Sequence, residues 1–228
     1  MNRDEAESFL RQSGWLSTLP IALQDDWLQG ARLVEVTKGD QMFAIQDDPR
    51  FMFGLAKGTF GALLSYHPQE TKLMMLYGAG NWAGDAAVLS GNAHRGTAVA
   101  RTECTCLAVP STHIEAVATR HPDIWRWMAQ NVLFQLDTFI TQTEGALYRD
   151  PICRLITMML SLCKLNPRQS SFELSTEEIG QMVGLTRNTV SKGLQILTKD
   201  GLISRRYRTL EIQSPTDLKT ELDRRTAR

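Results

Sequence analysis

The stretch STEEIGQMVGLTRNTVSKGLQILTKDGLIS, residues 175–204, decides the fold. Ser175 and Glu178 are spaced as a capping box, which predicts that a helix begins directly after the serine. Gly184 then offers a backbone that turns sharply without a steric penalty. Thr186 is a favourable N-cap residue for a second helix that begins immediately after this turn. Two short helices joined by a glycine turn form a helix-turn-helix.

The second helix of this pair is expected to have an apolar face and a polar face. Val190, Leu194 and Leu197 follow the spacing i, i+4, i+7, which predicts that their side chains are buried. The opposite face is polar near its N-terminus, where a helix-turn-helix reads bases in the major groove. An arginine can donate two hydrogen bonds to guanine, and an asparagine can pair with adenine. The predicted base-reading residues are Arg187, Asn188, Ser191 and Lys192.

Phosphate contacts are expected next to the same helix. Free backbone N–H groups at a helix N-terminus favour an anion there. The segment GLISRRYRTLEI, residues 201–212, reads as a charged hairpin whose guanidinium groups would hold the DNA backbone without reading its sequence. The predicted phosphate contacts are Thr186, Thr189, Arg205, Arg206 and Arg208.

The charge distribution agrees with a polyanionic partner for the C-terminal part. The chain has 228 residues, of which 43% are hydrophobic and 22% charged, as in folded proteins. Residues 151–228 contain 13 Lys and Arg against 8 Asp and Glu, whereas residues 1–150 contain 12 against 17. No apolar run is long enough for a membrane span and no signal sequence is visible, so a cytoplasmic protein is expected.

Residues 30–110 are expected to form β-structure. Short apolar runs such as RFMFGLAKGTFGALLSYH and TKLMMLYGAG are separated by turn-forming residues. No periodic segment of helix length interrupts them, which favours a barrel or a sandwich. The preceding residues 5–31 read as one or two short helices that cover one end.

Residues 122–148 read as one long helix with apolar residues on two flanks. One series recurs at alternating steps of four and three, the period of a coiled-coil seam. Trp125, Val132 and Phe139 widen the apolar surface beside it. We expect one flank to pack on its own domain and the other on a second copy of the chain; a long core helix of a monomer is the alternative. The predicted seam consists of Ala129, Leu133, Leu136, Ile140, Thr143 and Leu147.

A hinge is expected after this helix. Asp150 can cap the next helix, and Pro151 suits its first turn. The expected domains are an effector-sensing β-domain over residues 1–120, a dimerisation helix over 121–149 and a DNA-binding domain over 150–228.

These motifs resemble the CRP/FNR family, named after the cyclic AMP receptor protein and the fumarate-nitrate reduction regulator. The most specific matches are EIG, the VG turn, T-R-x-T-V-S-K, L-x-x-L and G-L-I-S within residues 175–204, and the resemblance covers nearly the whole chain. It implies an α+β protein with an N-terminal double-stranded β-roll like that of cyclic-nucleotide-binding domains, a long dimerisation helix and a C-terminal winged helix-turn-helix. It also implies a homodimer on a palindromic operator of double-stranded DNA, with RNA polymerase as a further partner if the protein is an activator.

The family resemblance also indicates where the operator is expected to differ. Cyclic AMP-responsive members usually have Glu where this chain has Asn188, and Arg where it has Lys192. We therefore expect an operator that differs from the usual half-site of the family.

The stretch GAGNWAGDAAVLSGNAHRGTAVARTECTCLAV, residues 78–109, resembles the phosphate-binding cassette of the family. In that cassette a Gly-Glu pair holds the ribose of the nucleotide, and an Arg-Ser pair holds its cyclic phosphate. Gly84 and Arg95 match the glycine and the arginine, while Asp85 is one methylene shorter than the glutamate. Gly96 follows the arginine, so the expected hydroxyl is absent or displaced to Thr97.

The long helix also departs from cyclic AMP-binding members. Phe139 and Ile140 stand where those members place Thr and Ser against the adenine. An apolar pair cannot replace these hydrogen bonds, and a buried amine left unpaired costs about 1–3 kcal/mol. Cyclic AMP is therefore disfavoured, and two alternatives stay open: another effector, or a vestigial pocket without a ligand. The predicted effector residues are Gly84, Asp85, Arg95, Gly96, Thr97, Phe139 and Ile140.

The sequence does not favour another kind of sensor or an enzyme. The chain has no cysteine before Cys104, so the iron–sulfur cluster of oxygen-sensing relatives is not expected. Cys104 and Cys106 lie two apart, which on a strand favours core packing over a redox pair, and no metal-binding cysteine spacing occurs. No paired histidines or activated nucleophile indicate a catalytic site. The remaining alternative is haem with an axial ligand among His67, His94, His113 and His121.

Overall fold

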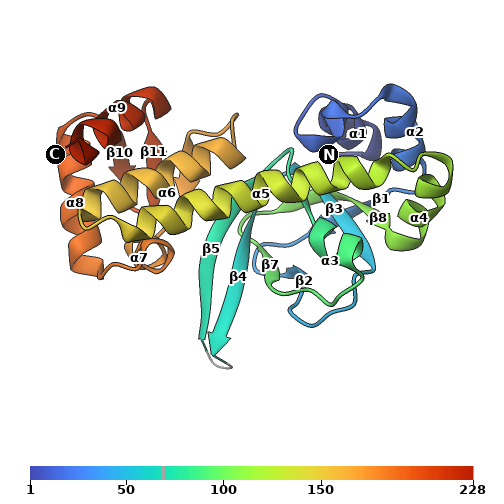
Figure 1. Ribbon diagram of the computed structural model, residues 1–228, viewed down its shortest axis with the longest axis horizontal. Helices are drawn as coiled ribbons and strands as arrows, with labels where there is room; N and C mark the ends of the chain where they lie inside the picture. Colours follow the sequence, from blue (N-terminus) through green and yellow to red (C-terminus); the bar gives the residue numbers. More distant parts are fainter. Residues whose placement is uncertain (68–69, 228) are drawn as a thin grey trace. The chain divides into compact units, whose positions relative to one another are not determined.

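The computed structural model describes residues 1–67 and 70–227, which fall into two compact units (Figure 1). The first unit comprises Met1–Thr71 and Leu76–Gln135, and the second comprises Lys72–Met75 and the chain from Leu136 onward. Helix α5 (Ile124–Leu147) contributes residues to each unit. Both helices and strands are present, so the predicted α+β class is confirmed. No described helix is long and apolar enough to cross a bilayer.

The β-structure predicted for residues 30–110 is a β-roll of two four-stranded sheets. Their strand orders are β1-β8-β3-β6 and β2-β7-β4-β5. A short helix, α3 (Asp85–Ser90), interrupts the strands and was not predicted from the sequence. The strands are β1 (Arg32–Val36), β2 (Gln41–Phe43), β3 (Phe51–Lys57), β4 (Thr59–His67), β5 (Glu70–Gly78), β6 (Trp82–Ala83), β7 (Thr97–Ala100) and β8 (Cys104–Pro110).

Three tryptophans form the centre of the core of the first unit. The rings of Trp15, Trp27 and Trp82 contact one another edge to face, with centroid separations of 5.1–5.7 Å. Gly54 of β3 is required here, because a Cβ would lie 2.5 Å from the Trp82 ring. The cluster therefore packs the first sheet against the N-terminal helices. These helices are α1 (Arg3–Arg11), the 3-10 turn Trp15–Thr18 and α2 (Ile21–Gln29), and α4 (Ser111–Arg120) follows the last strand of the roll.

The second unit contains the predicted helix-turn-helix and a small sheet of order β10-β11-β9. Ser175 and Glu178 form the predicted capping box, and Gly184 ends the first helix with φ 66°, in the left-handed region that favours glycine. The Thr186 hydroxyl accepts a hydrogen bond from the N–H of Thr189 and so caps the second helix, as predicted. The elements are α6 (Pro151–Leu165), β9 (Ser171–Glu173), α7 (Thr176–Val183), α8 (Arg187–Lys199), β10 (Ile203–Arg206), β11 (Thr209–Ile212) and α9 (Pro215–Thr226).

The predicted cap at the start of α6 is confirmed and is extended by α9. Asp150 Oδ1 accepts a hydrogen bond from the N–H of Ile152 at 2.8 Å, and Pro151 occupies the first turn. The other carboxylate oxygen of Asp150 pairs with Arg225 at 3.0 Å. Arg225 also pairs with Glu221, so the last turns of α9 are fixed to the beginning of α6.

Gly193 lies where α8 packs closely on α6. A Cβ at this position would lie 2.5 Å from Cδ1 of Leu155, which is fully buried and has little room to move. Gly193→Ala is therefore expected to lower the free energy of unfolding. Overpacking costs about 1–3 kcal/mol, which exceeds the roughly 1 kcal/mol that alanine gains in helix propensity.

Urea denaturation of Gly193→Ala measures this effect. Gln195→Ala changes an exposed residue of the same helix and is the matched control, expected within about 0.5 kcal/mol of the unmodified protein. A Gly193→Ala protein more stable than the unmodified one contradicts the close packing of α8 on α6.

Candidate DNA-binding surface and effector site

The polar face of α8 is exposed, as the sequence predicts. Val190, Leu194 and Leu197 are buried on the inner face of the helix. On the outer face, three of the predicted base-reading residues are exposed and Ser191 is half-buried. None of these four side chains has an ion pair or hydrogen bond within the described chain. The exposed residues are Arg187, Asn188 and Lys192.

The N-terminus of α8 has fewer free donors than expected. The N–H of Thr189 is bonded to Oγ1 of Thr186 at 3.3 Å, and the two hydroxyl oxygens lie 2.9 Å apart. The cap therefore uses one backbone donor and both hydroxyl groups. The N–H groups of Arg187 and Asn188 have no partner among the described residues, so they are the donors left for an anion.

The β10–β11 hairpin forms the predicted wing, but its three arginines differ. Arg205 turns inward, where its Nη2 donates to the carbonyl of Leu174 and the hydroxyl of Thr176, both at 3.2 Å. Burial lowers the pKa of this guanidinium. The structure thus gives Arg205 a packing role that the sequence did not indicate. Arg206 is exposed, and Arg208 lies 3.4 Å from the Glu178 carboxylate.

Tyr207 occupies the tip of the wing and was missed by the sequence analysis. Its residue surface is 93% exposed, and its φ of 51° lies in the left-handed region that a tyrosine rarely adopts. The ring, flanked in sequence by two arginines, is therefore available for a contact outside the chain.

In the cassette, Asp85 is buried at the start of α3. Gly84 precedes it with φ 91°, and a Cβ on this glycine would lie 2.7 Å from the carbonyl oxygen of Phe51. Asp85 is only 4% exposed. Its Oδ2 accepts hydrogen bonds from Nδ2 of Asn131 at 2.7 Å and from Nε2 of Gln135 at 2.8 Å. Burial raises the pKa of this carboxyl to about 6, although the backbone N–H of Ala86 and the two amides favour its charged form.

The pKa of Asp85 predicts a specific pH dependence of stability. The folded protein holds this proton up to about pH 6, whereas the unfolded chain releases it near its ordinary value of 3.8. Between these values the folded state binds more protons, so its stability falls as the pH rises. The fall amounts to at most about 3 kcal/mol.

Asp85→Asn removes this titration and keeps an oxygen acceptor for the two amides. We therefore expect the stability of the variant relative to the unmodified protein to increase between about pH 4 and about pH 7. Urea denaturation at both pH values measures the change. If the stability difference between Asp85→Asn and the unmodified protein is the same at about pH 4 and about pH 7, the burial of a titrating carboxyl at residue 85 is contradicted.

The other predicted cassette residues match the phosphate pattern of the family only in part. Arg95 is exposed and makes no ion pair with Asp85. A Cβ on Gly96 would lie 2.9 Å from the carbonyl oxygen of Leu63, so a serine does not fit there without a shift of the backbone. The hydroxyl of Thr97 already accepts a hydrogen bond from the N–H of Ile45 at 3.1 Å. The hydroxyl that the resemblance requires is therefore absent at residue 96, whereas Thr97 accepts this one bond and keeps its O–H as a donor.

Phe139 and Ile140 lie in the part of α5 that belongs to the second unit, and Ile140 is exposed. Neither side chain can donate or accept a hydrogen bond. Together with the occupied carboxylate of Asp85, this means that the residues present do not fit a cyclic nucleotide held as the resemblance implies.

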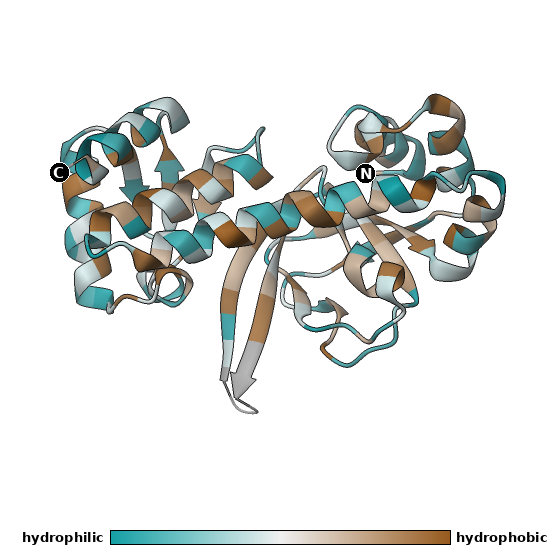
Figure 2. Cartoon of the chain, in the orientation of Figure 1, coloured by the Kyte–Doolittle hydropathy of each residue, from teal (hydrophilic) through white to brown (hydrophobic). Residues whose placement is uncertain are grey.

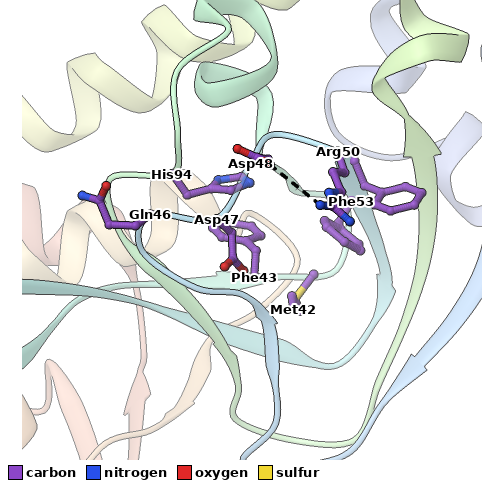
Figure 3. A pocket seen from close by; sticks show the side chains of 9 residues that line it. Met42, Phe43, Gln46, Asp47, Asp48, Arg50, Phe53 and His94 are labelled. Atoms are coloured by element: carbon purple, nitrogen blue, oxygen red, sulfur yellow. Dashed lines mark ion pairs between the residues drawn. The ribbon is translucent and has the colours of Figure 1, made fainter.

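A cavity of about 430 Å³ lies between His94 of the cassette and the segment from Met42 to Phe53 (Figure 3). His94 is buried against Phe43, with the two rings stacked at 3.9 Å, and Asp48 faces Arg50 at 3.8 Å across the rim. None of the predicted effector residues lines it, and no motif in the sequence indicated it. The lining residues are Met42, Phe43, Gln46, Asp47, Asp48, Arg50, Phe51, Phe53 and His94.

The cysteines and histidines have structural environments. Cys104 and Cys106 are free, buried thiols of β8, which confirms the expected core packing, and burial raises the pKa of Cys106 to about 12. His113 and His121 contact the backbone oxygen and the carboxylate of Asp26. The side chain of His67 lies outside the described residues. In the described part of the chain, no group of three or more His, Cys, Asp or Glu is arranged to hold a metal.

Comparison with known proteins identifies two domains. Residues 33–121 match the cyclic nucleotide-binding domain, and residues 153–221 match the Crp-like helix-turn-helix domain. The cAMP-activated global transcriptional regulator CRP of Pasteurella multocida is 22% identical over 167 residues, covering 71% of this chain and 80% of that protein. The global nitrogen regulator of Synechocystis is 27% identical over 127 residues, covering 53% and 56% of the two chains.

Solved structures share the fold. FixK2 from Bradyrhizobium japonicum has a TM-score of 0.71 at 18% identity, covering 83% of this chain and 96% of its own. A CRP-family transcriptional regulator from Thermus thermophilus has a TM-score of 0.63 at 22% identity, with coverages of 83% and 96%. With a cyclic nucleotide-binding domain followed by a Crp-like helix-turn-helix domain, the chain belongs to the CRP/FNR family of DNA-binding transcription regulators, which are not enzymes.

Proposed function

We propose that the protein is a homodimeric, sequence-specific regulator that reads a palindromic operator with helix α8. The observation that carries this proposal is the outer face of α8, where Arg187, Asn188 and Lys192 are exposed and unpaired while the inner face is buried. Because its partner is chromosomal DNA, we place the protein in the cytoplasm. RNA polymerase is a further partner if the protein activates transcription.

Base reading is assigned to the first turns of α8. Arg187 donates two hydrogen bonds to a guanine, Asn188 pairs with an adenine, and Ser191 and Lys192 reach adjacent bases. Each bidentate pair contributes roughly 1–3 kcal/mol of discrimination. The N-terminus of α8, capped by Thr186 and Thr189, contacts a phosphate group through the free N–H groups of Arg187 and Asn188. The wing residues Arg206 and Arg208 contact further phosphate groups. Arg205 supports the wing from inside the domain, through its hydrogen bonds to Leu174 and Thr176.

Dimerisation is assigned to the exposed apolar seam of α5. In the single chain, Leu133 is 59% exposed, Leu136 49% and Leu147 79%. Figure 2 shows apolar bands recurring along the helix. Ala129 is half-buried, and Ile140 and Thr143 are exposed in the same series. An apolar surface of this kind is buried when two parallel copies pair. A symmetric pair places two copies of α8 about 34 Å apart, which matches successive major grooves.

Regulation is assigned to the residues before α5. In the first candidate, an unidentified effector binds near Asp85 and Arg95, shifts the paired α5 helices and so sets the separation of the recognition helices. Such control requires that the effector bind one arrangement of the paired α5 helices more tightly than the other. In the second candidate the pocket is vestigial and DNA binding needs no ligand. The hydrogen bonds from Asn131 and Gln135 to Asp85 favour the second candidate. In both, residues 1–120 form the sensor, 121–149 the dimerisation helix and 150–228 the DNA-binding domain.

A binding selection from duplexes with a randomised core tests the proposed function. We expect enrichment of an inverted repeat whose half-site centres are about 10 base pairs apart. Affinity for the enriched duplex is expected to fall steeply with salt, because phosphate contacts release counterions. Failure to enrich any sequence, with and without cyclic nucleotides or metabolite extracts, would count against a sequence-specific regulator.

A further inference from the structure

Two amide side chains of α5 occupy the buried carboxylate of the cassette. Asn131 and Gln135 lie four residues apart, on the same face of the helix, and both donate to Oδ2 of Asp85, at 2.7 and 2.8 Å. Nε2 of Gln135 also lies 3.4 Å from the carbonyl oxygen of Trp82, which precedes α3. We call Asp85, Asn131 and Gln135 the amide clasp. It joins the beginning of α3 to the first half of α5 within one unit.

The amide clasp leaves no acceptor position for a ligand hydroxyl on Oδ2 of Asp85. Each oxygen of an ionised carboxylate has about two acceptor positions. Both positions of Oδ2 are used by the side-chain amides. A sugar hydroxyl could bond to this oxygen only by displacing Asn131 or Gln135. Such an exchange would replace one hydrogen bond to a charged acceptor by another of similar strength.

The amide clasp also fixes how α5 presents its apolar seam. Asn131 and Gln135 point to the β-roll, whereas Leu133, which lies between them in sequence, is exposed with its apolar face free. Rotation of α5 about its axis would move the seam and break both hydrogen bonds to Asp85 together. A ligand that made only the contacts that Asn131 and Gln135 already make would bind the DNA-binding arrangement of α5 no more tightly than another arrangement. Such a ligand would not shift the population of chains toward the DNA-binding arrangement.

We propose that the amide clasp takes the place of an effector, so that the protein binds its operator without a cyclic nucleotide. This inference rests on the proposed function and extends its second candidate. Asn131 and Gln135 act as positioning residues: they supply, from the chain itself, the donors that hold α3 on α5.

The test uses the full chain, freed of nucleotide and checked by mass spectrometry of a heat extract. A randomised duplex pool is first selected in parallel without nucleotide and with cyclic AMP or cyclic GMP. Fluorescence anisotropy on the enriched duplex then compares the unmodified protein, the double variant Asn131→Ala/Gln135→Ala, and Gln130→Ala, which changes an exposed neighbour on the same helix. The two single variants are included in case the double variant does not fold. Melting temperature is recorded for each protein.

We expect the unmodified protein to bind without nucleotide, and saturating cyclic AMP or cyclic GMP to change its affinity by less than about twofold. The double variant is expected to lose about tenfold in affinity, a typical size for coupling between sites, and each folded single variant to lose part of this. Gln130→Ala is expected to bind as the unmodified protein does.

Three results would overturn the inference, and they separate it from the proposed function. If the unmodified protein enriches a duplex only when a cyclic nucleotide is present, the amide clasp does not replace an effector, although the protein is still a regulator. If the clasp variants fold and bind the duplex with unchanged affinity, the amide clasp again does not replace an effector, and the protein is still a regulator. If no duplex is bound under any of these conditions, the proposed function fails and the inference fails with it.

Discussion

Replacing Leu133 and Leu136 together by glutamate is expected to convert the dimer into a monomer and to weaken operator binding by about 100-fold or more. Both leucines are about half exposed in the single chain, so the change leaves its core intact. Burying a leucine contributes about 1.5–3 kcal/mol, and in a symmetric pair each position counts twice. The variant loses this burial and also places four carboxylates in the interface.

The effect on DNA follows from the linkage of the two recognition helices. In a dimer, binding of the first half-site holds the second α8 near the other half-site at a high effective concentration, which raises avidity by about 10²–10⁴. A monomer loses this advantage while its α8 surface is unchanged. Light scattering after size exclusion measures the mass, and fluorescence anisotropy measures the affinity.

Glu144→Ala is the matched control, because it changes an exposed polar residue of the same helix outside the seam. It is expected to remain dimeric and to bind DNA normally. A Leu133→Glu/Leu136→Glu protein with the dimer mass and full affinity would support the alternative in which α5 serves a monomer.

Asn188→Ala is expected to relax the preference at one base pair of each half-site, with little change in affinity for unrelated duplexes. The asparagine is exposed on the first turn of α8, where its amide can pair with one adenine. Loss of this pair costs about 1–3 kcal/mol per half-site against the preferred base. Since a palindrome contains two half-sites, the free-energy losses at the two half-sites add, and the affinity for the selected operator falls by their sum.

Arg206→Ala is the contrasting variant, because Arg206 is exposed on the wing and is assigned to phosphate. It is expected to weaken binding to all duplexes similarly and to lower the slope of affinity against salt by about one unit per half-site. Parallel binding selections with the two variants distinguish these effects. If both variants lose the same sequence information, the assignment of base reading to α8 and of positioning to the wing is incorrect.

The helix-turn-helix could be predicted because its signals are local. A capping box, a glycine at the left-handed position and a threonine N-cap lie within about a dozen residues, and each determines its own part of the backbone. The seam of α5 was also visible, since its period depends on the helix alone. Helix α9 was missed, although Ser214, Pro215 and Asp217 carry an N-cap and a first-turn proline that could have indicated it.

Contacts between distant residues could not be predicted in this way. Asp85 meets Asn131 and Gln135 across 46 and 50 residues, and only the packed β-roll brings α3 against α5. The inward turn of Arg205 depends on the position of α7 beside the wing. For the same reason, the need for a glycine at residue 193 is visible only from the side chain of Leu155 that packs against it.

The most direct test of the whole account is native mass spectrometry of the protein with its selected duplex. If two exposed α8 surfaces read one palindrome, the spectrum will show two chains on one duplex, and a duplex cut to a single half-site will lose that complex. A single chain bound to the full duplex, or two chains that never bind DNA, would contradict the account.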